Sequence, residues 1–382
     1  MREGWEVKTL GEVCDILDNK RKPITKKDRI EGDIPYYGAT GILSYVRDYL
    51  FDEQLVLLGE DGAKWECGDN SAFIINGKTW VNNHAHVLRP NRKIVEDNWI
   101  VYNLNFQNLM PFVSGMTVPK LNQGNMRKIQ IPIPPLPEQK QIVKTLDLAF
   151  KQIDQAKANT EKNLANAKEL FASKLNEVFS QRGEGWEEKR LGDVCNIIGG
   201  GTPSKSKEEY YTGDILWATV RDMKKDTLNN TELKITKVAV KNSSTNIIKK
   251  NNVIIATRVG LGKVCMLSFD TAINQDLKGI IVKEKYDISN KFIFWWFKSI
   301  AKEIINQGTG LTVQGVKLDY IKSLKFPYLT IEKQEDIIVL LDRLNNQKEK
   351  LQIHYKQNLN NLEELKKSIL EKAFKGELDY AL

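Results

Sequence analysis

The stretch GWEVKTLGEVC at residues 4–14 returns as GWEEKRLGDVC at residues 185–195. The offset between the two copies, counted from Gly4 to Gly185, is 181 residues. Repeats that stack into solenoids are much shorter, at roughly 20 to 50 residues each. A repeat this long predicts two copies of a whole domain, and we interpret the chain as a fused and diverged dimer.

A second pair of similar segments has the character of long helices. Residues 138–179 and 333–374 contain no proline or glycine, and each segment is 42 residues long. Gln139 in the first segment recurs as Gln334 in the second. A helix of this length extends about 63 Å. The sequence therefore predicts one globular domain followed by one long helix, twice over.

Apolar residues recur with heptad spacing along both helical segments, which is typical of a coiled coil. Asn163 and Asn358 take equivalent places in this pattern. They are either buried amides that fix the register of the helices or solvated residues at the edge of the interface. The predicted helix–helix interface consists of Ile142, Leu146, Ile153, Asn163, Leu170, Ile337, Leu341, Leu344, Leu351, Tyr355, Asn358, Leu362, Leu365 and Ile369.

The connections decide the direction of the two helices. Only residues 180–184 separate the first helix from the second domain, and that domain leads directly into the second helix. If the apolar faces bury each other, the helices are antiparallel, with the domains at opposite ends of a spacer about 60 Å long. The repeat then implies pseudo-twofold symmetry. Residues 375–378 are expected to return the chain to the first domain.

The parts outside the helices mix short β-like runs with glycine, asparagine and proline. The predicted strands include residues 55–58, 72–75, 253–256 and 279–282, and the predicted shorter helices are residues 98–109 and 290–305. Residues 131–137, IPIPPLP, are expected to be extended because proline lacks an amide donor.

These patterns predict an α+β fold: two similar mixed α/β domains separated by two long antiparallel coiled-coil helices, with a pseudo-twofold internal repeat. The predicted boundaries are residues 1–137 for the first domain, 138–180 for the first helix, 181–331 for the second domain, 332–376 for the second helix and 377–382 for a tail.

The composition favours an extended anionic partner. Lysine and arginine number 57 against 49 acidic residues, which gives a net charge of +8, and the pI is about 9.0. No apolar run approaches the roughly 18 residues that a membrane span needs. The N-terminus opens directly into the repeat without a signal segment, so we expect a cytoplasmic protein that does not contact membranes.

Searching for chemistry gives little. The four cysteines form no Cys-x-x-Cys pair and are interpreted as reduced core residues, in preference to metal ligands. His84 and His86 form the one metal-like pair, and no metal site is predicted. Neither an amino-methyltransferase motif nor a Walker loop is found. We therefore predict no catalytic residue and no cofactor held by this chain.

Two similar basic modules on a rigid spacer suit a bipartite DNA target. In residues 256–263 two glycines lie between Arg258 and Lys263, so the backbone could approach a phosphate while the cations neutralise it. An ordinary turn is the alternative. Residues 59–64 take the comparable place in the first half.

Amide side chains in the later segments could pair with base edges, or could be solvated or capping groups. Tyr36 and Trp217, which open a matched pair of segments, are better explained as core anchors than as DNA contacts. The candidate DNA-binding residues are Thr40, Lys64, Asn82, Asn83, His84, Lys120, Thr202, Lys205, Thr219, Arg221, Arg258, Lys263, Asn274 and Gln275.

Four segments resemble, in the same order, those of specificity subunits of Type I restriction-modification systems. SGMTVPKLN at 114–122, followed by IQIPIPPLPEQKQI at 129–142, is similar to the end of a target recognition domain and its junction with a spacer helix. Residues 310–313 and 326–337 resemble this junction but lack the Pro-Pro-Leu-Pro run. The domain openings also resemble the family, so the resemblance covers essentially the whole chain.

The resemblance implies a non-catalytic DNA-recognition subunit. Each domain would be a target recognition domain that reads one half of a split double-stranded DNA sequence. The helices would act as a spacer and as the docking surface for modification (methyltransferase) subunits, two in number, which restriction subunits join. S-adenosylmethionine and ATP would belong to those partners. The alternatives are a free-standing methyltransferase or nuclease with an unrecognised site, or a coiled-coil scaffold that binds only protein.

Overall fold

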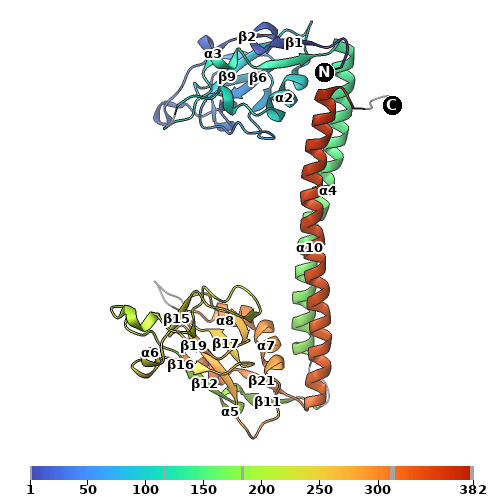
Figure 1. Cartoon of the computed structure of the whole chain (residues 1–382). Helices are drawn as coiled ribbons and strands as arrows, with labels where there is room; N and C mark the ends of the chain where they lie inside the picture. The colour runs from blue at the N-terminus through green and yellow to red at the C-terminus, as the bar shows by residue number, and fades with distance from the viewer. Residues whose placement is uncertain (1, 116, 182–184, 310–314, 379–382) are drawn as a thin grey trace. The chain divides into compact units, whose positions relative to one another are not determined.

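The computed structural model describes residues 2–115, 117–181, 185–309 and 315–378 (Figure 1). Its contacts divide the chain into two units, Met1–Glu161 with Lys356–Leu382, and Lys162–Tyr355. Each unit contains one mixed α/β domain and part of both long helices, α4 (Leu136–Ser180) and α10 (Ile331–Lys375). The α+β fold with two similar domains and two long helices is confirmed.

The first unit contains two four-stranded sheets and a two-stranded ribbon. The sheet orders are β2-β9-β6-β7 and β4-β3-β8-β5, and β1 pairs with β10. Strands β3 and β8 are parallel. The strands are β1 (Glu6–Thr9), β2 (Cys14–Ile16), β3 (Ile34–Gly38), β4 (Gly41–Val46), β5 (Phe51–Asp52), β6 (Leu55–Gly59), β7 (Ala72–Ile75), β8 (Lys78–Val81), β9 (Ala85–Pro90) and β10 (Gln130–Ile133). The helices are α1 (Leu10–Val13), η1 (Asp18–Lys20), η2 (Lys26–Asp28), α2 (Asp97–Phe106), η3 (Met110–Phe112) and α3 (Gln123–Met126).

Strand β6 lies at the centre of this domain and is buried along its whole length. Successive side chains of a strand point to opposite faces. Val56 and Leu58 accordingly join a core cluster with Trp99 of α2, whereas Leu55 and Leu57 face a second cluster. An apolar run without polar alternation is what a strand covered on both faces requires.

The second unit has a five-stranded sheet, β12-β20-β17-β18-β14, a four-stranded sheet, β15-β13-β19-β16, and the ribbon β11-β21. Strands β13 and β19 are parallel, as are β14 and β18. The strands are β11 (Glu187–Arg190), β12 (Cys195–Gly199), β13 (Ile215–Ala218), β14 (Thr227–Leu228), β15 (Leu233–Ile235), β16 (Asn246–Ile248), β17 (Val253–Ala256), β18 (Val264–Leu267), β19 (Thr271–Ile273), β20 (Leu277–Val282) and β21 (Lys325–Tyr328). The helices are α5 (Leu191–Val194), η4 (Glu208–Tyr211), α6 (Lys237–Lys241), α7 (Asn290–Ser299), α8 (Ala301–Asn306) and α9 (Leu318–Ser323).

The two units share equivalent side-chain hydrogen bonds at the start of each long helix. Gln139, in the first turns of α4, is fully buried; its side chain accepts the Glu96 N–H at 3.0 Å and donates to two backbone carbonyls. Gln334 of α10 does the same, accepting the Ser289 N–H at 2.9 Å. These hydrogen bonds satisfy the polar atoms of a fully buried amide side chain, as is usual for buried polar groups in proteins. Each glutamine thus ties a long helix to the domain that precedes it.

The proline-rich lead into α4 is shorter than the sequence predicts. Residues 130–133 form β10, which pairs with β1, but the helix already begins at Leu136 and so includes Pro137. The prediction that Pro137 is extended was therefore wrong. Proline is tolerated in the first helical turn, because the amide that it lacks would have no partner within the helix there.

Within each unit the long helices pack antiparallel. In the first unit the start of α4 meets the end of α10: Ile142 and Leu146 share a core with Leu370. In the second unit the end of α4 meets the start of α10, since Leu175 and Leu341 share a core. Leu378, beyond α10, packs against the first core, as expected for a chain that returns to the first domain. Residues 379–382 of the predicted tail lie outside the described residues.

The heptad assignment was wrong at three leucines: Leu170, Leu351 and Leu365 are 73%, 43% and 47% exposed. Asn163 is exposed as well, which agrees with the second of its two interpretations, a solvated residue at the edge of the interface. At these three places the less exposed residue is the next one along the helix, namely Phe171, Gln352 and Lys366. A straight helix drifts by about 20° per heptad relative to a strict seven-residue repeat, so the buried face moves to later positions along each helix.

Along this interface, lysine ammonium groups lie over aromatic rings: Lys348 Nζ lies 4.4 Å from the Phe171 ring centroid and Lys366 Nζ lies 4.9 Å from that of Phe150. The remaining predicted interface residues are buried or half-buried, namely Ile142, Leu146, Ile153, Ile337, Leu341, Leu344, Tyr355, Asn358, Leu362 and Ile369.

All four cysteines are free thiols, but one is not a core residue. Cys14, Cys195 and Cys265 are buried, whereas Cys67 is exposed. It lies beside Gly68, whose φ of +90° marks a surface turn. Burial raises the pKa of Cys195 and of Cys265 to about 12.

Candidate nucleic-acid interface

In the first unit, four loops meet at one edge of the sheets. Strands β3 and β8 are parallel, so the loops that follow them emerge together. The Glu60 N–H donates to the His84 carbonyl at 2.8 Å, and the Leu121 N–H donates to the Glu60 carbonyl at 2.8 Å. We name residues 39–40, 59–64, 82–84 and 117–122 the first loop edge.

The second unit repeats this arrangement. The Thr257 N–H donates to the Asp276 carbonyl at 2.8 Å, and the Val316 N–H donates to the Thr257 carbonyl at 2.9 Å. The Asn274 N–H donates to the Ala218 carbonyl at 3.0 Å. In the first unit the Asn82 N–H likewise donates to the Tyr37 carbonyl, at 3.1 Å. We name residues 218–222, 257–263, 274–276 and 315–316 the second loop edge. Residues 310–314, which include part of the junction motif, lie outside the described residues, as does Met116.

Behind the first loop edge lies a buried group of charges. Ligand atoms of Asp18, Glu60 and His86 lie within 4.8 Å of one another, a spacing that a metal ion could bridge. The carboxylates already have cationic partners: Arg21 pairs with Glu60, and Lys120 Nζ lies 2.8 Å from Glu60 Oε1. A metal ion there would face two fixed positive charges, so the donor set fits an ion-pair network better than a metal site.

These contacts shift the pKa values of two groups. Burial acts to raise the pKa of Asp18, but hydrogen bonds with His86, Val87 and Gln123 together outweigh it, and the pKa lies below its ordinary value. The hydrogen bond with Glu60 raises the pKa of Lys120. Both groups therefore keep their charges near neutral pH and hold the loops together.

The predicted DNA-binding residues of the first unit divide into exposed and buried groups. Thr40, Lys64, Asn83 and His84 are exposed. His84 contacts Asp61 through Nδ1 at 2.5 Å. Lys120 keeps 43% of its side chain exposed despite its acidic partners.

Two predicted amides are corrected by the structure. Asn82 is 3% exposed and its side chain accepts the His84 N–H at 2.8 Å. Asn274, at the equivalent position, is 5% exposed and accepts the Asp276 N–H at 3.1 Å. Both amides are capping groups that shape a turn, and neither is placed to pair with a base.

The second loop edge is more basic than the first. Arg221, Arg258, Lys263 and Gln275 are exposed there. The Arg258 side chain is 52% exposed, and its Nε lies 3.8 Å from Asp276 Oδ1. Thr219 uses its hydroxyl within the loop, as donor to Asp222 Oδ2 at 2.8 Å.

Thr202 and Lys205 follow β12 and lie outside the second loop edge as defined. The Thr202 hydroxyl bonds to the side chain of Gln275, which links this segment to the edge. Lys205 is exposed. Tyr36 and Trp217 are 1% and 3% exposed, which agrees with their interpretation as core anchors.

Sequence reasoning missed His86 and Lys278, a buried and a half-buried residue behind the loops. His86 lies opposite Leu58 in the sheet, and Lys278 lies opposite Ile255 at the equivalent place. Burial lowers the pKa of Lys278. The repeat would have aligned His86 with Lys278, but strands with different loop lengths obscure the correspondence.

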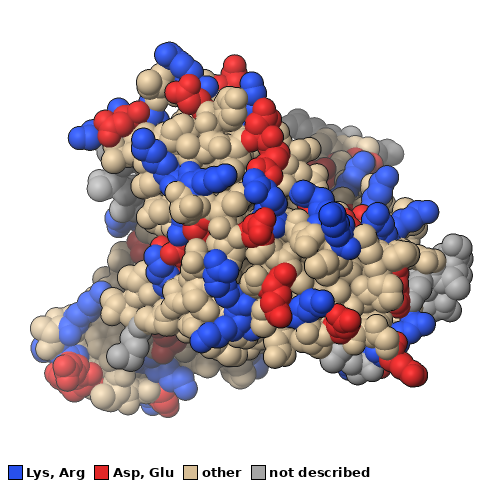
Figure 2. All heavy atoms as spheres, turned by 90° about the horizontal axis from the view of Figure 1, so that it is seen from above, with Lys and Arg blue, Asp and Glu red and all other residues tan. Residues whose placement is uncertain are grey.

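On the face drawn in Figure 2, lysine and arginine side chains are interspersed with acidic ones and form no single basic patch. On this face, therefore, bulk positive charge does not mark a binding surface for an anionic partner, and the loop edges are identified by their local geometry instead.

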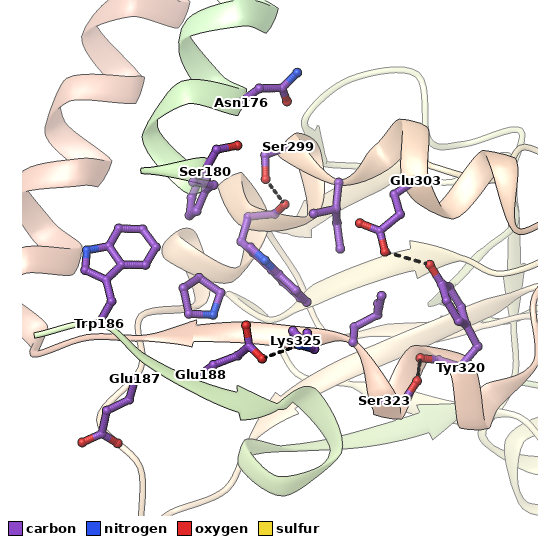
Figure 3. A pocket seen from close by; sticks show the side chains of 15 residues that line it. Asn176, Ser180, Trp186, Glu187, Glu188, Ser299, Glu303, Tyr320, Ser323 and Lys325 are labelled. Carbon is purple, nitrogen blue, oxygen red and sulfur yellow. Dashed lines mark hydrogen bonds and ion pairs between the residues drawn. The ribbon is translucent and has the colours of Figure 1, made fainter. Parts of the chain in front are cut away.

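A cavity of about 780 Å³ lies in the second unit and shares no lining residue with the second loop edge. Figure 3 shows Trp186 and Ser180 on one side and Glu303 with Tyr320 on the other. At this cavity the last residue of α7 is the small Ser299. The equivalent helix of the first unit, α2, ends with Phe106 instead, and the centroid of its ring lies 5.3 Å from that of Phe374. The acidic lining does not suit a phosphate backbone.

Among the described residues, no helix is both long and apolar enough to cross a membrane.

The comparisons with known proteins agree with one another. The family model described as "Type I restriction modification DNA specificity domain" matches residues 2–165 and 183–362. A putative type I restriction enzyme specificity subunit of Haemophilus influenzae is 28% identical over 355 residues, which cover 89% of this chain and 88% of that protein.

Two solved structures share the fold over nearly the whole chain. One of them comes from work on complex assembly and conformational transition of the type I R-M system. It has a TM-score of 0.79 at 19% identity, with 99% of both chains covered. The HsdS subunit from Thermoanaerobacter tengcongensis has a TM-score of 0.61 at 17% identity, covering 99% of this chain and 98% of that one. The chain therefore belongs to the family of Type I restriction-modification DNA specificity subunits, with two DNA-specificity domains.

Proposed function

We propose that each domain reads one half of a bipartite DNA target through its own loop edge. The observation that carries this proposal is the repeated geometry: two domains of a DNA-specificity family present the same four loops, with exposed polar and cationic side chains, at the same edge. The loops have diverged, with Asp61 and His84 in the first domain against Arg258 and Asp276 in the second. The two half-sites should therefore differ in sequence.

The two long helices would set the gap between the half-sites and serve as the docking surface for modification subunits. Both helices are continuous over 45 residues, and a continuous helix is a stiff spacer of fixed rise per residue. Two modification subunits, joined by restriction subunits, fit the duplicated architecture. S-adenosylmethionine and ATP would be bound by those partners, and this chain would have no catalytic activity of its own.

A domain exchange tests this proposal. We would replace the second domain by that of a family member with a different target, co-express the chimaera with the modification subunit and sequence the methylated sites. One half of the recognised sequence should change, while the other half and the gap stay the same. A change in both halves would contradict independent reading by the two domains.

A second assay separates this function from that of a free-standing enzyme. The purified chain alone, supplied with S-adenosylmethionine and target DNA, should transfer no methyl group; the complex with the modification subunit should. Methyl transfer by the chain alone would favour an unrecognised active site. A chain whose complex shows no salt-dependent affinity for DNA would instead be a protein scaffold.

A further inference from the structure

The second loop edge contains a backbone outlier. Val259 has a φ of +48°, and Asn251, with a φ of +66°, is the one other non-glycine residue with positive φ in the described ranges. Asparagine adopts this left-handed region with some ease, but a β-branched side chain is strongly disfavoured there. Val259 is therefore strained, and strained residues of this kind cluster at functional sites.

The repeat shows which residue would relieve the strain. Gly59 pairs with Ala85, and Ala256 pairs with Leu277 at the equivalent place, so Gly62 and Val259 each come three residues after a matched position. Gly62 has a φ of +70°. The same left-handed turn thus carries glycine in the first domain, where it costs little, and valine in the second.

The turn does not need the valine side chain. The Ala256 N–H donates to the Lys263 carbonyl at 3.0 Å, and the Lys263 N–H donates to the Gly260 carbonyl at 3.2 Å. Arg258 N–H bonds to the Asp276 carbonyl at 3.3 Å. Val259 itself is 52% exposed and belongs to none of the described core clusters. Neither packing nor backbone bonding explains why valine stands there.

We propose that Val259 is a base-reading residue of the second domain, whose γ-methyl groups contact the 5-methyl group of a thymine in the major groove. Its neighbours Arg258 and Lys263 are exposed cations that would hold the adjacent phosphates. Apolar contact with this methyl group is a recognised way to read thymine. The valine side chain is shorter than the leucine, isoleucine and phenylalanine wedges that enter between bases. The inference rests on the proposed function of this loop edge.

The test removes one methyl group from the DNA and the whole side chain from the protein. Once the half-site is known from its methylated sequence, each thymine is replaced in turn by uracil, which lacks the 5-methyl group. The wild-type complex with the modification subunit should bind one such duplex about fourfold more weakly, the change in affinity that one buried methyl group confers. The Val259→Gly complex should bind the thymine and uracil duplexes equally.

Asn251→Gly is the matched control. It places glycine at the other non-glycine position with positive φ in the described ranges, in the turn that precedes β17, whereas Val259 lies in the loop that follows this strand. This variant should keep the wild-type preference for thymine. Val259→Gly should also unfold at a Tm no lower than that of the wild type, because glycine suits the left-handed turn. A valine with a structural role would instead lower the Tm on removal and leave the thymine preference unchanged.

The proposal is overturned if no thymine in the half-site is sensitive to uracil, or if Val259→Gly retains the preference. These failures differ from a failure of the proposed function. If the second domain reads DNA without Val259, exchange of that domain still changes the half-site. If it does not read DNA, the exchange changes nothing.

Discussion

Arg258→Ala is expected to weaken DNA binding by the assembled complex and to leave folding almost unaffected. The guanidinium is half exposed and its Nε lies 3.8 Å from Asp276 Oδ1, and exposed pairs of this kind contribute about 1 kcal/mol or less to stability. On DNA, the loss of one neutralised phosphate makes the slope of log K against log salt less negative by about 0.9. The affinity should then fall about eightfold at 0.1 M salt and about fourfold at 0.2 M.

Fluorescence anisotropy of a labelled target duplex, titrated with the complex at several potassium chloride concentrations, measures both quantities. Lys249→Ala is the matched control, because this lysine is 77% exposed and pairs with Asp270 at 2.9 Å in the turn before β17. The control should reproduce the wild-type slope. If Arg258→Ala also gives the wild-type slope and affinity, Arg258 contacts no phosphate and the assignment of the second loop edge is wrong.

Three further predictions concern the fold and the spacer. Leu341→Ala should lower the free energy of unfolding by about 2 to 5 kcal/mol, because Leu341 is fully buried. Leu351→Ala, at a 43% exposed position, should change this free energy by about 0.5 kcal/mol or less. Equal losses for the two variants in urea titrations would contradict the corrected interface. The pKa of Asp18 is lowered in the folded chain. The ionised Asp18 carboxylate therefore contributes to folding stability above the ordinary aspartate pKa of about 4, and this contribution is lost as the pH falls through the lowered value. The Tm of Asp18→Asn should therefore be lower than that of the wild type at pH 7 and converge with it in acid; a constant difference down to the lowest pH would argue against the ion-pair network. Insertion of one heptad into both long helices should lengthen the tolerated gap between half-sites by about 3 base pairs, since seven residues rise about 10.5 Å; an unchanged gap would rule out the helices as the spacer.

Much of the fold could be predicted from the sequence because it is encoded in strong, local patterns. The long helices lack proline and glycine, and the repeat fixes the order of the elements, so both domains and both helices were found. The start of α4 at Leu136 was missed because proline, which breaks a helix interior, is tolerated in the first turn. The heptad assignment placed Leu170 and Leu365 in the interface because it kept a strict seven-residue repeat, whereas a straight helix drifts relative to that repeat and half-buries Phe171 and Lys366 instead.

The candidate site was harder to predict because its residues come from four loops. The sequence indicated Arg258 and Lys263 through the glycines between them, and both side chains are exposed. It could not distinguish reading amides from capping amides: Asn82 and Asn83 are neighbours, but the first is buried in a turn and the second is exposed. The strain at Val259 is invisible in the sequence, since it depends on a backbone angle that only the closed turn imposes.

The most direct test of the account is to sequence the methylated sites in DNA from cells that express this chain with its modification subunit. The account predicts a two-part motif, with two different half-sites separated by a gap of constant length and unspecified sequence. A single continuous motif, or half-sites found at variable separations, would contradict the claim that two fixed domains each read one half of the target.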